Sequence, residues 1–369
     1  MNDTYYMNYA LNLARAASGQ TSPNPVVGAV LAKNNQIVGF GAHLKAGEPH
    51  AEVHAIRMAG EKAAGSSLYV TLEPCSHFGK TPPCADLVIK SGIKKVFVAV
   101  TDPNPRVAGR GIERMREAGI EVETGLLAEE ARDLNKVFFY HIATGLPYVT
   151  LKTAVSLDGK TATSTGDSKW ITGEEARQDV HVFRHQHDAI LVGVNTIIKD
   201  DPSLTVRLPA GGNNPIRVVL DTHLRTPLTA KIITDHEAPT WIVTGSAVPA
   251  DKVESFKKAG ITIVKTQAPT ISIKAMLSLL GEQGITSLFV EGGSEVHGSF
   301  LKERTFQQMI TYIAPKLIGG KLAPTSFGGL GMETMAEAVP LNFKHVDMIG
   351  KDIRIIAEPE VNNNVYWNS

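Results

Sequence analysis

The chain has 369 residues, more than one hydrophobic core usually organises, so its length predicts two domains. Its 37 acidic residues balance its 37 basic ones, which disfavours a general nucleic-acid binder, because such proteins usually carry a basic excess. The N-terminal segment lacks the layout of a signal peptide, and no apolar run approaches the roughly 18 residues of a membrane span. We therefore expect a cytoplasmic protein with no nucleic-acid or membrane partner.

The first part of the chain alternates between helix and strand patterns. A helix is expected from the capping pair Asp3-Thr4 to Gly19, followed by a hairpin that turns at Asn34-Asn35, because asparagine tolerates positive φ. Further helices are expected at 51–64, 85–92 and 111–118, one more helix at 127–145, and strands at 26–33, 36–43, 67–72 and 94–100. This alternation indicates an α/β layer with a largely parallel sheet.

The segment Thr144-Gly145-Leu146-Pro147 breaks this pattern, so we expect a domain boundary there, with domains at 1–145 and 146–369. Beyond it the apolar runs resume. Short buried strands are expected at 147–156, 189–194, 216–221, 239–245, 261–266 and 287–293. Helix-like segments separate several of them, so the second part is predicted to be an α/β domain of its own.

Both cysteines of the chain, Cys75 and Cys84, lie in the segment EPCSHFGKTPPCAD. In the cytosol, paired thiols are more often metal ligands or catalytic groups than a disulfide, although a disulfide or two buried thiols remain alternatives. With His50 they make three strong zinc ligands, which leaves a fourth position for water, as in catalytic zinc sites. Glu52, two residues after His50, could carry the proton of that water. Taken singly, the histidine could merely cap a helix and the glutamate complement its dipole.

This arrangement resembles the zinc-dependent nucleobase and nucleotide deaminases. Their signature is His-x-Glu followed by Pro-Cys-x-x-Cys, in which the glutamate is an acid/base and not a ligand. His50-Ala51-Glu52 and Pro74-Cys75 match it, whereas eight residues instead of two separate Cys75 from Cys84. The departure points to a subfamily that carries the insert SHFGKTPP between the two cysteines.

Three further segments narrow the resemblance: SPNPVVG at 22–28, GAH at 41–43 and TDPNP at 101–105. Together with HAE and the cysteine insert they are similar to the bifunctional riboflavin-biosynthesis enzymes, in which a pyrimidine deaminase is fused to a reductase. The resemblance implies a cytidine-deaminase-like three-layer domain with one zinc ion and a dihydrofolate-reductase-like α/β domain that uses NADPH. It also implies a homodimer or homotetramer.

By the same resemblance, the substrate is a small molecule, a diaminopyrimidinone that carries a ribosylamino 5-phosphate. Hydrolytic deamination at the zinc, with Glu52 as the catalytic residue that relays protons, precedes reduction of the ribosyl group to a ribityl group. The implied substrate-binding residues of the first domain are Asn24, His43, Lys80, Asp102 and Asn104.

The second domain has no Gly-x-Gly-x-x-Gly or Walker loop, but Gly292, Gly293 and Ser294 are expected at a helix N-terminus, which favours an anion. LKTAVSLDGKTAT, SKWITG, GVNTIIKDDPSLTVR and VEGGSEVHGSF resemble the reductase partner. The implied NADPH-binding residues are Ala154, Trp170, Thr196, Asp200, Gly293, Ser294, Glu295, Val296, His297, Gly298 and Ser299. The implied substrate-binding residues are Lys152, Ser168, Arg184, Leu204, Arg207 and Glu291. Lys152 and Asp158 are candidates for assisting ring opening or proton delivery, although Lys152 could equally be a cation that only binds phosphate.

Three other interpretations remain open from the sequence. The chain could be a single-activity deaminase whose second half only binds a ligand or subunits. It could act on RNA, although the neutral charge and the cysteine insert argue against this. The zinc could also be purely structural, in which case Glu52 would have no catalytic role.

Overall fold

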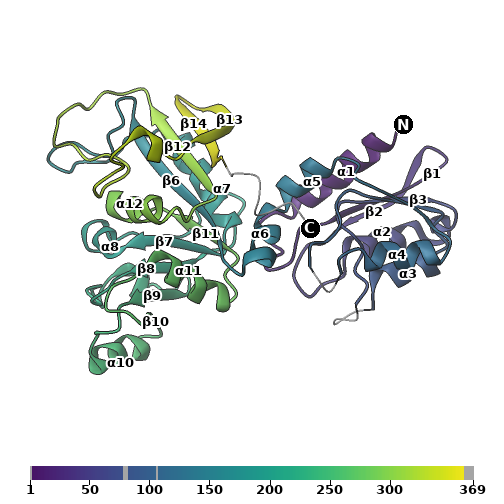
Figure 1. Ribbon diagram of the computed structural model, residues 1–369, viewed down its shortest axis with the longest axis horizontal. Helices are drawn as coiled ribbons and strands as arrows, with labels where there is room; N and C mark the ends of the chain where they lie inside the picture. Colours follow the sequence, from purple (N-terminus) through teal and green to yellow (C-terminus); the bar gives the residue numbers. More distant parts are fainter. Residues whose placement is uncertain (1, 78–81, 105–106, 361–369) are drawn as a thin grey trace. The chain divides into compact units, whose positions relative to one another are not determined.

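The computed structural model describes residues 2–77, 82–104 and 107–360. The chain forms two compact units, which divide between Gly145 and Leu146 and each have their own sheet (Figure 1). Among the described residues, no helix has the length and apolar character that a membrane span requires.

The first unit is built on a five-stranded sheet of order β2-β1-β3-β4-β5. Strand β1 is antiparallel to both of its neighbours, whereas β3, β4 and β5 run parallel. The sheet is therefore mixed. The antiparallel pairing of β1 with β2 is the predicted hairpin, but the antiparallel pairing of β1 with β3 was not expected, and the parallel part is limited to β3, β4 and β5. Asn34 and Asn35 make the hairpin turn with φ of 52° and 61°, as predicted. The strands are β1 Gly28–Lys33, β2 Gln36–Ala42, β3 Ser67–Val70, β4 Lys95–Val98 and β5 Glu121–Thr124.

Helices cover both faces of this sheet and complete three layers (Figure 1). Because side chains alternate along a strand, Val30 of β1 packs in one cluster with Met7 and Leu11, while its neighbour Leu31 packs in another with Ala55. The helices are α1 Asp3–Ala16, α2 Ala51–Ala59, α3 Cys84–Lys90, α4 Arg110–Glu117, α5 Ala128–Leu134 and α6 Lys136–Thr144, and a short 3-10 turn at Gly60–Ala63 extends α2. Helices α1 and α5 cover one face, and α2, α3 and α4 the other.

Two expected helix boundaries of the first unit are corrected. Helix α1 is capped by Asn2, whose Oδ1 accepts from the Tyr5 N–H at 3.0 Å, and not by Asp3-Thr4, because Asp3 instead accepts a bond from the Tyr69 hydroxyl at 2.6 Å. The single helix expected at 127–145 is two helices. The break lies at Asn135, whose side chain bonds both the N–H and the carbonyl of Val26 at 2.9 Å.

The second unit is built on a nine-stranded sheet of order β10-β9-β8-β7-β11-β6-β12-β14-β13. The pairs from β10 to β12 are parallel, and β14 is antiparallel to β12 and β13. The six strands expected from the sequence are present, and β12, β13 and β14 were not expected. The strands are β6 Tyr148–Ser156, β7 Ala189–Gly193, β8 Ile216–Leu220, β9 Thr240–Thr244, β10 Thr262–Lys265, β11 Ser287–Val290, β12 Gln308–Ala314, β13 Leu341–Ile349 and β14 Asp352–Pro359.

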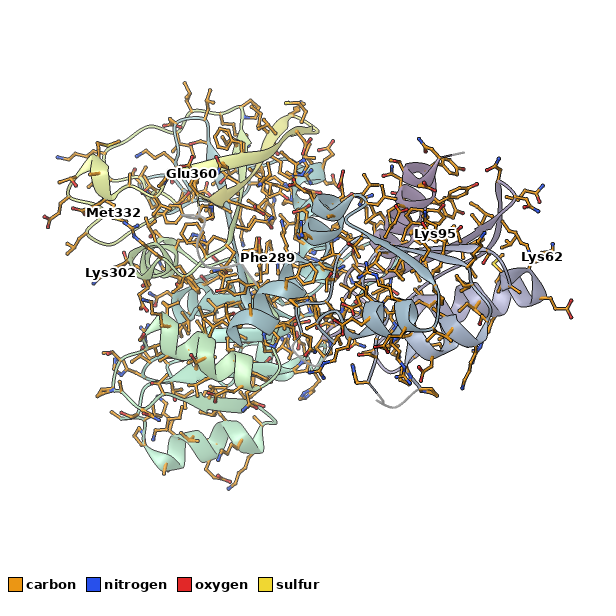
Figure 2. The ribbon with its side chains drawn as sticks, turned by 45° about the vertical axis from the view of Figure 1, so that its right-hand side comes forward. Lys62, Lys95, Phe289, Lys302, Met332 and Glu360 are labelled. Atoms are coloured by element: carbon orange, nitrogen blue, oxygen red, sulfur yellow. The ribbon has the colours of Figure 1, made fainter. Side chains whose placement is uncertain are left out.

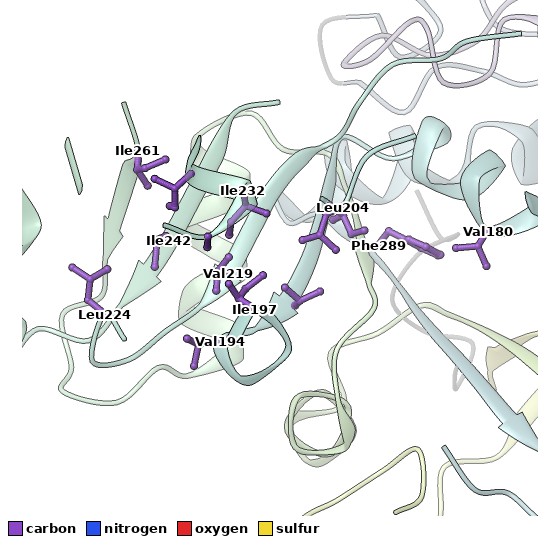
Figure 3. Packing of buried hydrophobic residues seen from close by; sticks show 14 of the residues in the cluster. Val180, Val194, Ile197, Leu204, Val219, Leu224, Ile232, Ile242, Ile261 and Phe289 are labelled. Atoms are coloured by element: carbon purple, nitrogen blue, oxygen red, sulfur yellow. The ribbon is translucent and has the colours of Figure 1, made fainter. Parts of the chain in front are cut away.

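Helices bury both faces of the parallel part, as such sheets require. Ile190 of β7 packs on one face in a cluster that includes Val219 and Ile242 (Figure 3), while Leu191 packs on the other face. Phe289 of β11 lies among the packed side chains, whereas Lys302 of α12 points outward (Figure 2). The helices are α7 Glu174–Gln186, α8 Val194–Asp200, α9 Lys231–Thr234, α10 Ala250–Lys258, α11 Ile273–Glu282 and α12 Ser294–Glu303, with a 3-10 turn at Met335–Glu337.

Candidate functional site

The three expected zinc ligands meet in the first unit. His50 is the N-cap of α2, Cys75 follows β3, and Cys84 is the first residue of α3. His50 Nδ1 lies 3.7 Å from Cys75 Sγ and 3.2 Å from Cys84 Sγ, and the three donor atoms all lie within 4.8 Å of one another. A tetrahedral zinc ion with ordinary bond lengths spaces its sulfur and nitrogen ligands about 3.6 Å apart and two sulfurs about 3.8 Å apart. The residues therefore fit zinc.

The two thiols lie close together beside His50, and a bound cation would favour their thiolate forms. Cys75 Sγ accepts a bond from the Cys84 N–H at 3.3 Å. Hydrogen bonding from Cys84, assisted by His50, lowers the pKa of the Cys75 thiol even though burial opposes this shift. Conversely, the bond to Cys75 and burial raise the pKa of the Cys84 thiol. Zinc binds thiolates, so binding at this pair releases protons.

Glu52 lies in the first turn of α2 and is buried. Burial raises the pKa of its carboxyl to about 7, although the positive charge of His50 opposes this shift. Glu52 is not part of the ligand cluster. Its place beside the cluster and its proton affinity suit an acid/base, not a fourth ligand.

A cavity of about 220 Å³ opens onto two of the metal ligands, His50 and Cys75. It brings together four of the residues that the sequence placed at the substrate, Asn24, His43, Asp102 and Asn104, and Glu52 with them. The fifth, Lys80, lies outside the described residues. The full lining is Asn24, Pro25, Val27, His43, His50, Glu52, Leu72, Glu73, Cys75, His77, Asp102, Asn104, Val107 and Phe138.

His43 is held between two partners and orients Asn24. Its Nδ1 lies 3.3 Å from the Pro49 carbonyl oxygen, which can only accept, so Nδ1 donates. Its Nε2 then accepts from Asn24 Nδ2 at 3.1 Å, which leaves Asn24 Oδ1 as an acceptor. Burial lowers the pKa of His43, in keeping with a neutral ring.

Asp102 and Asn104 form a tight turn at the cavity. Asp102 Oδ1 accepts from the Asn104 N–H at 2.8 Å, and burial raises the pKa of Asp102 to about 6. Sequence reasoning gave several other lining residues no role, among them Glu73 and Phe138. Glu73 lies in the cysteine segment but was given no role there. Phe138 of α6 could not be predicted as a cavity residue, because an aromatic residue on an apolar helix face is typical of core packing.

In the second unit, three predicted substrate residues form a buried ionic cluster. Arg184 of α7 donates to Glu291 through Nε at 2.6 Å and Nη2 at 3.1 Å, and its Nη1 donates to the Thr205 carbonyl. Lys152 Nζ of β6 lies 3.8 Å from Glu291 Oε2. Burial opposes ionisation of Glu291, but the charges of Arg184 and Lys152 hold its pKa at about 2. Burial lowers the pKa of Lys152, and Glu291 counteracts this shift.

The other predicted substrate residues of this unit lie on loops. Leu204 is buried with a φ of 54°, and both Ser168 and Arg207 are exposed. Asp158 anchors a loop: its carboxylate accepts from Ser156 Oγ and from the N–H groups of Ile318 and Gly319. These bonds fix the carboxylate in the loop, and a role of Asp158 in ring opening or proton delivery stays a prediction.

The predicted NADPH residues are spread over four places. Ala154 lies on β6, and Thr196 and Asp200 lie in α8. Trp170 is 63% exposed, and the Arg177 guanidinium lies 4.6 Å from its ring centroid. The remaining residues, Gly293, Ser294, Glu295, Val296, His297, Gly298 and Ser299, cap and begin α12 after β11, as the sequence predicted for Gly293 and Ser294.

Part of this last segment is covered by the chain itself. The Gly328 N–H donates to the Ser294 carbonyl at 2.9 Å, and His297 is buried with Nδ1 3.2 Å from the Ser326 carbonyl. At Gly293, by contrast, a Cβ would meet no atom within 4 Å. The open end of the segment is thus the helix N-terminus, where N–H groups favour a phosphate.

Comparison with known proteins identifies both units. A family model described as the cytidine and deoxycytidylate deaminase zinc-binding region matches residues 1–100, and one described as the RibD C-terminal domain matches residues 147–355. Riboflavin biosynthesis protein RibD of Bacillus amyloliquefaciens is 56% identical over 97% of this chain and 96% of its own length. The chain belongs to the RibD family. The Escherichia coli RibD protein is 42% identical over 96% of this chain and 98% of its own.

Solved RibD structures have the same fold. Acinetobacter baumannii RibD superposes with a TM-score of 0.89 at 41% identity, covering 97% of this chain and 99% of that one. A Thermotoga maritima protein described as a diaminohydroxyphosphoribosylaminopyrimidine deaminase/5-amino-6-(5-phosphoribosylamino)uracil reductase gives a TM-score of 0.86 at 36% identity, covering 96% and 98%.

Membership of the RibD family confirms several predictions. The chain has the expected cytidine-deaminase-like and reductase folds, and it is a bifunctional deaminase and reductase of riboflavin biosynthesis. Zinc and NADPH are the cofactors of these domains, and the His50, Cys75 and Cys84 cluster supplies the zinc ligands that the first domain requires. The single-activity deaminase and the RNA-acting deaminase are thereby set aside.

Proposed function

We propose that residues 1–145 hydrolyse an amino group from a diaminopyrimidinone ribosylamino phosphate and that residues 146–369 reduce the ribosyl group of the product. The observation that carries the first half is a single cavity that contains Glu52 beside the His50, Cys75 and Cys84 cluster. The reaction named for the similar Thermotoga maritima protein supports the choice of substrate.

In the deamination, His50, Cys75 and Cys84 hold zinc, which when bound supplies an activated water at neutral pH. Glu52 accepts the proton of that water and returns it to the departing amine. Water and the aminopyrimidine thus become a pyrimidinone and ammonia, and Glu52 ends with the charge it had at the start. Burial supports this assignment, since it places the pKa of Glu52 near the working pH.

The remaining cavity residues bind the substrate in this proposal. Asn24 presents Oδ1 as an acceptor to an N–H group of the pyrimidine, because His43 occupies its amide nitrogen. Asp102 and Asn104 provide further polar groups on the cavity wall. Lys80, which lies outside the described residues, is assigned to the phosphate, since an ammonium meets a phosphate as a point charge.

In the reduction, NADPH when bound supplies the hydride. We assign the binding of its phosphates to the N-terminus of α12 at Gly293 and Ser294, with Ala154, Trp170, Thr196 and Asp200 as further contacts. Lys152 holds a proton at the ribosyl oxygen as the ring opens, and Glu291 keeps its ammonium in place. Lys152 as a cation that only binds phosphate remains the alternative.

Ser168, Arg184, Leu204, Arg207 and Glu291 complete the substrate site of the second unit in this proposal. Arg184 uses three of its five N–H groups within the protein, so two are available to a phosphate. Arg207 is exposed, so its guanidinium is accessible to an anion from solvent.

A stepwise assay tests the two halves. Ammonia release from the diaminopyrimidinone nucleotide is expected without NADPH, and NADPH oxidation is expected only after the deaminated product has formed or has been added. Zinc analysis should give one ion per deaminase domain. NADPH oxidation on the undeaminated substrate, or ammonia release from zinc-free protein, would contradict the proposal.

We also propose a homo-oligomer, a dimer or tetramer, that works in the cytoplasm. Strand β13 is the edge of the nine-stranded sheet, and it exposes Phe343, Val346 and Met348. An open strand edge that carries apolar side chains favours pairing with another chain. Light scattering after size-exclusion chromatography gives the oligomeric state directly, and a monomeric mass would contradict the proposal.

A further inference from the structure

Glu73 connects the metal-ligand loop to a neighbouring loop of the cavity. It is buried, with 4% of its surface exposed, and it directly precedes Pro74 and Cys75. Its Oε2 accepts from the backbone N–H of Asp102 at 3.2 Å and from that of Gly109 at 3.0 Å. The same oxygen therefore binds Asp102, which precedes Asn104 in the chain, and Gly109, which follows it.

The other oxygen of Glu73 bonds the start of α4. Oε1 accepts from the N–H of Gly111 at 2.9 Å and from that of Ile112 at 3.3 Å. These N–H groups lie in the first turn of the helix, where no helical carbonyl can satisfy them and where a negative charge is favourable. Gly111 also lies against the Pro74 carbonyl so closely that a Cβ there would clash. The helix, the loop and the ligand segment therefore meet at one side chain.

We propose that Glu73 is a positioning residue for the deamination: it holds Asp102 and Asn104 at the cavity wall, in register with the metal ligands. This inference rests on the proposed function, in which Asp102 and Asn104 contact the pyrimidine nucleotide. Glu73 lines the same cavity, but its two oxygens are occupied by four backbone donors. It acts through the loop and not on the reacting atoms.

The role requires a group that only accepts hydrogen bonds. A glutamine has nearly the same shape, but its NH₂ group would face two backbone N–H groups in place of an oxygen. We expect Glu73→Gln to lose the backbone hydrogen bonds that one of the two carboxylate oxygens accepts. Asp102 and Asn104 would then occupy several positions and bind the substrate less well. The metal ligands and Glu52 are unchanged, so the chemical step should be affected less than binding.

The test is steady-state ammonia release from the diaminopyrimidinone nucleotide, with zinc content and NADPH oxidation on the deaminated product measured on the same preparations. Glu73→Gln is expected to raise KM tenfold or more, to change kcat less than threefold, and to keep zinc and reductase activity at wild-type levels. Asp102→Asn, measured in parallel, is expected to raise KM as well.

Asp188→Asn is the matched control. Asp188 is a carboxylate of the second unit that, like Glu73, accepts hydrogen bonds from backbone N–H groups. Its Oδ2 accepts from the N–H groups of Thr286 and Ser287 and from Thr286 Oγ1. Its replacement disturbs a similar set of bonds away from the deaminase cavity. The KM for deamination should therefore stay at the wild-type value.

The outcomes separate the positioning role from other roles. An unchanged KM in folded Glu73→Gln, with Asp102→Asn impaired, overturns the role of Glu73 and leaves the proposed function intact. Loss of zinc from Glu73→Gln also overturns it, because Glu73 would then hold the ligand segment. Wild-type protein that releases no ammonia contradicts the proposed function itself. If Glu73→Gln is insoluble, Glu73→Asp, which keeps the charge but is shorter, should raise KM by a smaller factor, and an unchanged KM there has the same meaning.

Discussion

The two sites of this enzyme are built in opposite ways. The deaminase centre takes its metal ligands and its proposed acid/base from three short segments, at His50 to Glu52, Cys75 and Cys84. The reductase cluster joins Lys152 of β6, Arg184 of α7 and Glu291, which follows β11, so its members are far apart in the sequence. The first site depends on rare residue types in a local pattern, and the second on common charged residues that only the sheet brings together. We therefore expect the first site to be sensitive to the loss of any one ligand and the second to the loss of any one charge.

The largest effect that separates the two sites should come from removing a metal ligand. Cys84→Ala leaves His50 and Cys75, which are too few to hold zinc firmly. We expect zinc and deamination to be lost, while NADPH oxidation on supplied deaminated product continues. Metal analysis and the two separate assays measure this. Parallel loss of both activities would show that the two sites depend on each other.

Glu52→Gln should abolish the acid/base function without removing the metal. The side chain keeps its shape but can no longer accept a proton, and general acid/base catalysis typically contributes about 10²- to 10⁴-fold. Deamination should fall by a factor in that range while zinc content, folding and reduction stay normal. Deamination retained at the wild-type rate would remove Glu52 from the mechanism and revive a structural role for the zinc.

In the reductase cluster, Glu291→Gln should destabilise the second unit. It leaves the buried charges of Lys152 and Arg184 without their carboxylate, a change that typically costs about 3–5 kcal/mol. Urea unfolding should show the loss in the second unit, and deamination should continue in native buffer. Unchanged stability would mean that the two cations are compensated by another group.

The pH dependence of stability offers a finer test of the same cluster. The folded-state pKa of Glu291, about 2, lies below its ordinary value of 4.5, so its contribution to stability is complete above about pH 4.5 and is lost as the pH falls toward 2. The difference corresponds to about 3 kcal/mol. The stability gap between wild type and Glu291→Gln, measured in urea at successive pH values, should narrow below pH 4.5. A constant gap would contradict the depressed pKa.

The smallest effect is expected from Asn2→Ala, which touches neither site. It removes the N-cap of α1, worth about 1 kcal/mol. The first unit should melt a few degrees lower, with both activities unchanged below the transition. Asn12→Ala, in the same helix but without a capping bond to the backbone, serves as the control. A change in KM from Asn2→Ala would show that α1 influences the cavity.

Much of the fold follows from patterns of a few residues. The Asn34-Asn35 turn, the buried strands of the parallel core and the helix that begins at Ser294 were all predicted, because turn chemistry and periodicity act locally. The break at Asn135 was not predicted. Its cause is a pair of bonds to Val26, which is distant in sequence, and a local helical pattern cannot reveal such a partner.

The sequence by itself determined the chemistry of the metal centre, because His-x-Glu and two thiols in an insert of defined length are rare unless they serve a metal. Only the tertiary structure decided which polar groups are free to act. It showed that His43 and Glu73 are occupied by partners within the protein, that Asp158 anchors a loop, and that Phe138 lines the cavity. Hydrogen-bond satisfaction is a property of groups in space, and backbone donors in particular leave no trace in the residue types that carry them.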